Sequence, residues 1–234
     1  MSKQITLVLF FVCSILPSIW EAHATTSLPE CKGNDPSRFN NCYGSFQRNG
    51  EHYVGDWKDG RPHGTGTYTS RQGGFTYVGQ FTNGMRHGNG TLNSQSGVYV
   101  GEFLNDMLHG QGSITLIDGS KYTGDWRNNQ PDGRGFHDYG TGGSFEGQLK
   151  AGKRHGQGVL INEAGNKYVG EFVNDIVEGL GIVFNSSGEI TAMGRYQAGV
   201  LVSEEIIDDS RFNEHLKAVI RQENVRRISI AGKQ

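Results

Sequence analysis

The chain has 234 residues, and its 22 Lys and Arg residues nearly balance its 24 Asp and Glu residues. Because binding of nucleic acid needs a concentrated basic face, this near-neutral balance argues against a nucleic-acid partner. Glycine is abundant, at 36 residues, and only 35% of the residues are hydrophobic, so a core must be built with few aliphatic contacts.

Residues 1–24 have the pattern of a secretory signal peptide. Lys3 precedes an apolar run at residues 5–16, and Ala-His-Ala at residues 22–24 is the small-residue pattern that signal peptidase cleaves. The run is about 12 residues long, whereas a membrane-spanning helix needs about 20. The sequence therefore predicts cleavage between Ala24 and Thr25 and an exported product that is periplasmic or secreted.

Residues 25–42 form an opening segment that contains two cysteines, Cys31 and Cys42. In an oxidising compartment such a pair is expected to form a disulfide, with two free thiols as the alternative. A tetrahedral zinc site would need a second pair of ligands, which the segment does not have. Because the spacing is not Cys-x-x-Cys, we interpret the disulfide as a structural staple rather than a redox centre.

Residues 43–202 form a repeat domain. An aromatic-x-Gly triplet recurs at successive spacings of 24, 22, 23, 23 and 23 residues, with a truncated copy before it and a weaker copy at residues 192–194. The triplets begin at Tyr53, Tyr77, Tyr99, Tyr122, Phe145 and Tyr168, and their glycines are Gly55, Gly79, Gly101, Gly124, Gly147 and Gly170. A fixed period of this size is typical of a repeat architecture.

Each copy is predicted to be a β-hairpin. Two positions after the glycine stands a large apolar residue: Trp57, Phe81, Phe103, Trp126 or Phe172, with Leu149 and Tyr196 as departures. A turn pair such as Asp59-Gly60 follows, and its residue types tolerate the positive φ of primed hairpin turns. The returning strand carries Gly-x-Gly, formed by Gly64 and Gly66, Gly88 and Gly90, Gly110 and Gly112, Gly133 and Gly135, Gly156 and Gly158, and Gly179 and Gly181.

Alternation along a strand places Tyr53, Gly55 and Trp57 on one face. We expect the glycines to leave slots in which aromatic rings from the facing strand lie flat, so that ring against glycine replaces leucine against leucine. An aromatic side chain buries about 150–250 Å², so the stack could be stable without a second layer. The same residues form the candidate binding face.

This pattern resembles the MORN (membrane occupation and recognition nexus) repeat, whose unit has Tyr-x-Gly-x-Trp/Phe, a turn and Gly-x-Gly. The resemblance covers residues 43 to about 200, and "LPECKG" followed by "NNCYGSF" is similar to the opening of exported bacterial members. The resemblance implies an all-β fold, an elongated and twisted antiparallel meander of about seven hairpins.

Two series of polar residues were candidates for chemistry. Histidines precede the Gly-x-Gly pairs at His63, His87, His109 and His155. Neighbouring copies lie about 10 Å apart, too far to share a zinc ion that needs each nitrogen within about 2.1 Å, so we expect these histidines to hydrogen-bond locally beside the turns. Carboxylates follow the strand glycines at Asp56, Glu102, Asp125 and Glu171, but Gln80 and Gln148 interrupt the series. No unique glycosidase pair results, and we expect solvated outer-face residues that discourage sticking between sheets.

Residues 203–234 form a C-terminal helix and tail, since Phe212, Leu216, Val219 and Ile220 fall at helical spacing. Asp209 or Ser210 is expected to cap the helix. The helix is interpreted as a cap over the last open edge of the sheet. Its excess of basic residues leaves a membrane-surface helix as the alternative.

The sequence predicts an exported, non-catalytic scaffold that binds a protein, peptide or glycan partner in the cell envelope. Exposed aromatic residues that are not used in glycine packing would be its anchors. Association with membrane lipid is the alternative function, and a hydrolase comes third. No cofactor or metal is expected, and the sequence is compatible with a homodimer.

Overall fold

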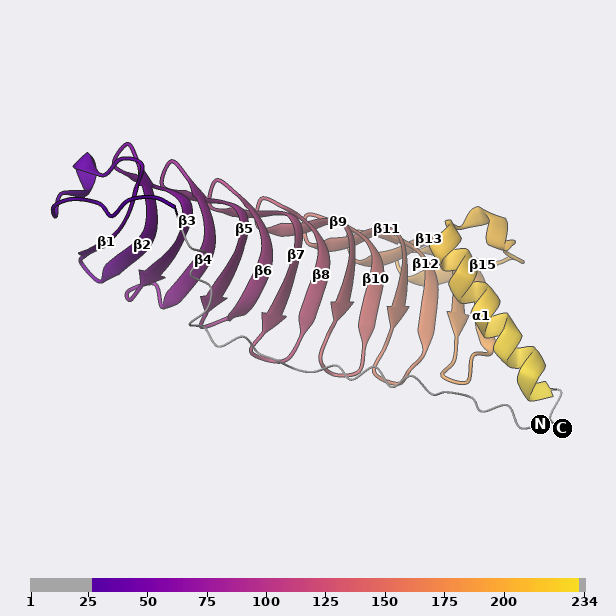
Figure 1. Ribbon diagram of the computed structural model, residues 1–234. Coiled ribbons are helices and arrows are strands. Elements are labelled where there is room, and N and C mark those ends of the chain that lie inside the picture. Colours follow the sequence, from indigo (N-terminus) through magenta and orange to yellow (C-terminus); the bar gives the residue numbers. More distant parts are fainter. Residues whose placement is uncertain (1–26, 232–234) are drawn as a thin grey trace, which may run out of the picture.

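The computed structural model describes residues 27–231. The described residues form one antiparallel sheet of fifteen strands in sequence order, which confirms the expected meander of hairpins. Figure 1 shows an elongated, twisted body with the helix α1 beside its C-terminal end. The predicted signal peptide and its cleavage site lie outside the described residues. The elements are η1 (Pro36–Arg38), β1 (Cys42–Arg48), β2 (Glu51–Lys58), β3 (Arg61–Ser70), β4 (Phe75–Thr82), β5 (Met85–Ser94), β6 (Gly97–Leu104), β7 (Met107–Leu116), β8 (Lys121–Arg127), β9 (Gln130–Asp138), β10 (Ser144–Lys150), β11 (Lys153–Ile161), β12 (Lys167–Val173), β13 (Ile176–Phe184), β14 (Ile190–Gln197), β15 (Val200–Glu204), η2 (Asp209–Arg211) and α1 (Glu214–Ala231).

The opening segment covers the free edge of β1. The disulfide between Cys31 and Cys42 is present. The Cys31 N–H donates to the Tyr43 carbonyl and the Tyr43 N–H donates to the Pro29 carbonyl, both at 2.8 Å. The disulfide therefore holds a stretch of backbone against an edge that would otherwise offer unpaired groups to another strand.

The two-residue turns have the predicted geometry. In the copy that contains Tyr77, both turn residues have positive φ, 53° at Asn83 and 87° at Gly84, as a type I′ turn requires. The Gly84 N–H also donates to the Pro62 carbonyl of the preceding copy at 2.8 Å. Each turn thus closes its own hairpin and binds it to the one before.

The tyrosine ring of each copy lies on a pair of glycines. Gly79 and Gly90 face each other across β4 and β5. A Cβ atom placed on Gly90 would lie 2.4 Å from Cε2 of Tyr77, and one on Gly79 would lie 2.5 Å from the Tyr77 hydroxyl oxygen. Only glycine leaves room for the ring. The expected packing is present: Gly90 on β5 receives the ring of Tyr77 from the facing strand β4, and the same ring also lies on Gly79 of its own strand.

The strand bends at this glycine. Tyr77 and Phe81 are four residues apart, about 13 Å along a straight strand, yet their ring centroids lie 5.1 Å apart. A register shift between Gly79 and Phe81 marks a bulge, and bulges bend the strand that contains them. The aromatic face therefore lies on the inside of each bend, and we call the opposite side the outer face.

Edge-to-face ring contacts connect the copies. Tyr77 contacts Phe103 of the next copy with centroids 4.9 Å apart, and equivalent contacts run from Phe39 through the copies to Tyr122. Leu149 interrupts the series of rings but occupies the same buried position. The departures from the repeat pattern therefore fill the core without breaking the stack.

The C-terminal segment covers the outer face rather than the last edge of the sheet, so the expected edge cap is corrected. Its side chains Ile207, Phe212, Leu216 and Ile220 pack on apolar outer-face residues, which are Val159, Val169, Leu180, Ile182 and Phe184. At the corresponding positions the first three copies carry Thr, Asn, Gln or Ser after each glycine of the Gly-x-Gly pair. The sheet is thus apolar on its outer side where the segment covers it.

The helix also begins later than expected. α1 begins at Glu214, and the Asn213 Oδ1 accepts a hydrogen bond from the Leu216 N–H at 3.1 Å. Asp209 and Ser210 belong instead to η2, where Asp208 Oδ1 accepts the Ser210 N–H at 2.7 Å. The turn before the helix has a cap of its own, which the helical spacing alone did not separate from α1.

Candidate functional site

The polar residues that follow the strand glycines are structural acceptors. Gln80 Oε1 accepts the Asn89 N–H at 2.8 Å, and Glu102 Oε1 accepts the Gln111 N–H at 2.8 Å. The same bond recurs in other copies at Asp56, Asp125, Gln148 and Glu171. These outer-face side chains thus have a structural role in addition to the solvated one that the sequence predicts. Glutamine and carboxylate interchange here because each supplies the oxygen that the backbone needs.

The first glycine of each Gly-x-Gly pair serves this contact and not the ring. Gly88 has a φ of 63°, and a Cβ atom there would lie 2.0 Å from the Gln80 Oε1. Gly64, Gly110, Gly133, Gly156 and Gly179 likewise have positive φ and face the acceptor of their own copy. Of the paired glycines expected to receive rings, only the second of each pair does so.

The histidine series lies beside the turns. His63 Nδ1 accepts the Asn83 N–H at 3.5 Å, and at equivalent positions Asp132 and Glu178 accept the N–H of Ala151 and Ala198. The Nδ1 atoms of His87, His109 and His155 are buried without a hydrogen-bond partner. Within residues 27–231 no group of three His, Cys, Asp or Glu residues is placed to hold a metal ion. Local hydrogen bonding is thus observed at His63.

The repeat aromatics are too buried to contact a partner. Tyr77 is 0% exposed, and the most exposed member of the tyrosine series, Tyr168, is 8% exposed. Burial raises the pKa of Tyr77 and of Tyr99 to about 12. The aromatic face that was the candidate binding face is therefore the core of the molecule. Among the outer-face aromatics, Phe136 is 44% exposed.

A single cross-strand row runs along the outer face. Its members pair in register across β2 to β14 and are Val54, Thr67, Val78, Thr91, Val100, Ser113, Thr123, Phe136, Glu146, Val159, Val169, Ile182 and Met193. The C-terminal segment packs on the last four. Val100 remains 54% exposed, so the row continues from a covered part into a longer uncovered part.

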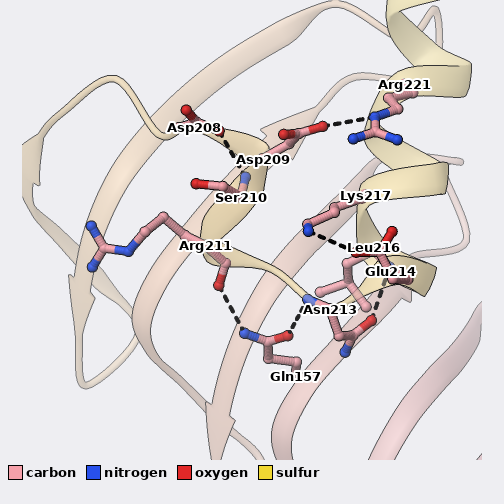
Figure 2. A network of polar contacts seen from close by, with 10 residues as sticks. All are labelled: Gln157, Asp208, Asp209, Ser210, Arg211, Asn213, Glu214, Leu216, Lys217 and Arg221. Carbon is pink, nitrogen blue, oxygen red and sulfur yellow. Dashed lines mark hydrogen bonds and ion pairs between the residues drawn. The ribbon is translucent and has the colours of Figure 1, made fainter.

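Gln157 on β11 binds the backbone of the C-terminal segment (Figure 2). Its Nε2 donates to the Arg211 carbonyl at 3.2 Å and its Oε1 accepts the Asn213 N–H at 2.8 Å. The bonded backbone leads directly into α1. Sequence reasoning missed this residue because its partners lie more than fifty positions away and no local pattern marks them.

Two hollows on the outer face meet at Arg134. The first, of about 300 Å³, lies between β9, β10, β11 and the start of α1, and its wall includes Arg134, Phe136, Glu146, Gln157, His215 and Leu216. The second, of about 390 Å³, includes Asp125, Arg127, Asp132, Lys150 and His155. Charged and apolar groups thus converge where the covered part of the row ends.

A histidine of α1 and a carboxylate of the sheet lie close together at the first hollow. His215 Nε2 lies 3.2 Å from the Glu146 Oε1, and the two side chains are 36% and 50% exposed. Arg134 uses its backbone N–H to reach Asp125, while its guanidinium forms none of the ion pairs found in the described part of the chain. That guanidinium is therefore available to a ligand.

The fold and this surface are those of a repeat protein with an exposed outer face. The model of the MORN repeat family matches residues 53–75, 77–98, 99–121, 122–144, 145–167 and 168–188. These matches cover more than half of the chain, so the chain belongs to the MORN repeat family, whose repeats are binding or scaffold modules and are generally non-catalytic. A comparison with curated proteins found no match. Among the described residues, no helix has the length and apolar character needed to cross a membrane.

Proposed function

We propose that this chain is an exported, non-catalytic scaffold that binds a protein or peptide partner in the cell envelope through its outer face. The observation that carries the proposal is the contact between the sheet and the C-terminal segment. There the outer face already binds a polypeptide, with apolar side chains under Leu216 and Ile220 and with main-chain hydrogen bonds from Gln157. The uncovered part of the row offers the same geometry to another chain.

The burial of the repeat aromatics favours a protein or peptide over a glycan. Binding anchors are commonly exposed aromatic or arginine side chains. Tyr77 and Phe172 are 0% and 1% exposed, so their rings offer no platform on which a sugar could stack. The outer face instead presents the Val and Thr side chains of the cross-strand row together with Phe136 and Arg134. This combination of apolar groups and a hydrogen-bond donor suits a polypeptide.

The polar series support a non-catalytic role. A carboxylate that accepts a backbone hydrogen bond, as Glu102 does, is already used by the fold. The histidines lie beside the turns, where His63 accepts a hydrogen bond from the Asn83 N–H. Neither series places an acid and a base around one substrate position.

The alternative of membrane association finds less support. A membrane-surface helix inserts its apolar side among lipids, but Leu216 and Ile220 of α1 are only 1% and 5% exposed because they pack on the sheet. The disulfide between Cys31 and Cys42 suits an oxidising compartment outside the cytoplasm and so supports export.

Capture from cell-envelope extract tests the proposal. The bait is residues 25–234, compared with two outer-face variants, V78E/V100E and F136E, and with the control I117E. Ile117 is 81% exposed and lies between β7 and β8, so the control adds one negative charge away from the row, as F136E adds one within it. We expect wild type and I117E to retain the partner and at least one outer-face variant to lose it. Equal capture by all four baits would contradict the proposal, and binding to liposomes alone would favour the membrane alternative.

A further inference from the structure

We propose that the first hollow binds the C-terminus of a partner peptide, and this inference rests on the proposed function. Arg134 would bind the terminal carboxylate, and an apolar last side chain would lie on Phe136. Both residues come from β9, and they line a hollow of about 300 Å³ together with the start of α1. That volume lies at the lower end of the range for ligand pockets, which suits one terminal residue and its neighbour.

The position of Arg134 in its repeat identifies what it can bind. Arg134 is the middle residue of Gly133-Arg134-Gly135, as Gln157 is in the next copy. Gln157 shows that a side chain at this position can bind a polypeptide that crosses the outer face. It donates a hydrogen bond to one backbone carbonyl and accepts one from a backbone N–H. Arginine carries five donors and no acceptor. Arg134 at the equivalent position therefore favours a ligand group that only accepts hydrogen bonds. A carboxylate is such a group, and it can accept two parallel hydrogen bonds from the guanidinium.

The spacing of the hollow suits a terminal residue. Arg134 and Phe136 are two positions apart on β9, and side chains at i and i+2 of a strand point to the same face about 7 Å apart. A C-terminal residue carries its carboxylate and its side chain on one Cα atom, so it can reach both. Phe136 is 44% exposed and supplies the apolar contact, whereas Leu216 is 1% exposed and only bounds the hollow at the start of α1.

The other charged groups of the hollow are compatible with an anion. Glu146 pairs in register with Phe136 and would repel a carboxylate, but His215 Nε2 lies 3.2 Å from its Oε1 and offsets that charge when it is protonated. Glu146 can also accept the N–H of the bound terminal residue. Asp125 lines the second hollow and not the first, and it already accepts the Arg134 backbone N–H.

The test uses the mature chain, residues 25–234, and two synthetic peptides that differ in one group. Acetyl-Gly-Gly-Ser-Gly-Ala-Leu with a free carboxylate is titrated against the same peptide with an amidated end, and binding is followed by amide NMR shifts. We expect shifts at Phe136 and Leu216 with the free carboxylate, and an affinity about tenfold lower after amidation, since a charged hydrogen-bonded pair is lost.

Variants assign the effect to the residues. R134Q should lower the affinity for the free carboxylate about tenfold and remove the difference between the two peptides. R127Q is the matched control, because Arg127 is an exposed arginine that pairs with Asp132 in the second hollow, and it should leave binding unchanged. Equal binding of both peptides, no effect of R134Q, or no shifts up to about 10 mM peptide would overturn the inference.

The two proposals can fail separately. If R134Q still captures the envelope partner while V78E/V100E does not, and the peptides do not bind, the terminal-carboxylate site is wrong and the outer-face scaffold stands. If no outer-face variant alters capture, the proposed function itself is wrong, whatever the peptides do.

Discussion

Individual residues in each repeat have distinct structural roles that recur from copy to copy. Gly90 provides the floor under the Tyr77 ring, whereas Gly88 provides a positive φ that lets Gln80 reach the backbone. The Tyr77 hydroxyl then donates to the Gln80 carbonyl at 2.9 Å. Ring, bulge and polar acceptor are therefore one connected unit, and each glycine can be tested by itself.

Gly90→Ala should destabilise the protein strongly. The new Cβ would lie 2.4 Å from two atoms of Tyr77, and overpacking of this kind costs about 1–3 kcal/mol or more. Urea unfolding measures the loss. Thr91→Ala, on the outer face of the same strand, is the control and should change the free energy of unfolding by less than about 0.5 kcal/mol. Similar stability of the two variants would show that the ring does not need the glycine.

Glu102 tests the structural role of the polar series. Glu102→Gln keeps an oxygen for the Gln111 N–H and should leave stability nearly unchanged. Glu102→Ala removes the acceptor and should cost about 1 kcal/mol in the free energy of unfolding. Chemical denaturation of both variants distinguishes this role from a purely solvated one, in which the two substitutions would behave alike.

The buried tyrosines should make the protein sensitive to alkaline pH. Burial raises the pKa of Tyr99 from its ordinary value of 10.0 to about 12, so the folded state holds this proton more tightly than the unfolded state. The resulting stability is complete below pH 10.0 and is lost as the pH rises through about 12. Denaturation between pH 8 and pH 11.5 (roughly that window) should show the decline. Tyr99→Phe should reduce its slope, and an unchanged slope would contradict this cause.

At the scale of the hairpin, the type I′ turns set the register of every copy. Ala151 has a φ of 49°, a conformation that costs an L-residue such as alanine roughly 1 kcal/mol and that asparagine tolerates. Ala151→Asn should therefore stabilise the protein by about 0.5–1 kcal/mol in thermal unfolding. Ala192→Asn, within β14, is the control and should bring no gain. A loss of stability in Ala151→Asn would contradict the turn geometry.

The hairpins could be predicted from the sequence because their signals are local. Turn pairs such as Asn83-Gly84 and the glycine spacing carry their own geometric meaning. The place of α1 could not be predicted from its helical spacing, since that pattern shows only which side is apolar. A usable signal did exist in the sheet: outer-face positions are Thr67 and Thr91 in early copies but Val159 and Ile182 in late ones.

The site was harder to predict than the fold. Gln157 and Arg134 are ordinary polar residues between glycines, and their importance depends on a segment that folds back from far along the chain. The buried aromatics were expected to leave some members exposed as anchors, but the bend at each glycine closes the rings inside. Periodicity specifies the stack, whereas the binding surface depends on contacts between distant residues.

On the scale of the whole molecule, the array is covered at its first edge and is covered differently on its two faces. The opening segment with Cys31 covers the β1 edge, the rings fill the inner face, and the C-terminal segment covers the outer face of the last copies. In a repeat array each unit depends mainly on its neighbours. The uncovered outer face can therefore vary for binding without disturbing the aromatic stack.

Proton NMR of the glycine Hα atoms tests the ring-on-glycine stack most directly. A proton that faces an aromatic ring is shielded by the ring current, so the Hα resonances of Gly66, Gly90 and Gly112 should lie well upfield. Gly119 and Gly152, which have open space around them, should resonate near ordinary values. If Gly66, Gly90 and Gly112 also resonated at ordinary values, the rings would not lie on them and the stack described here would be wrong.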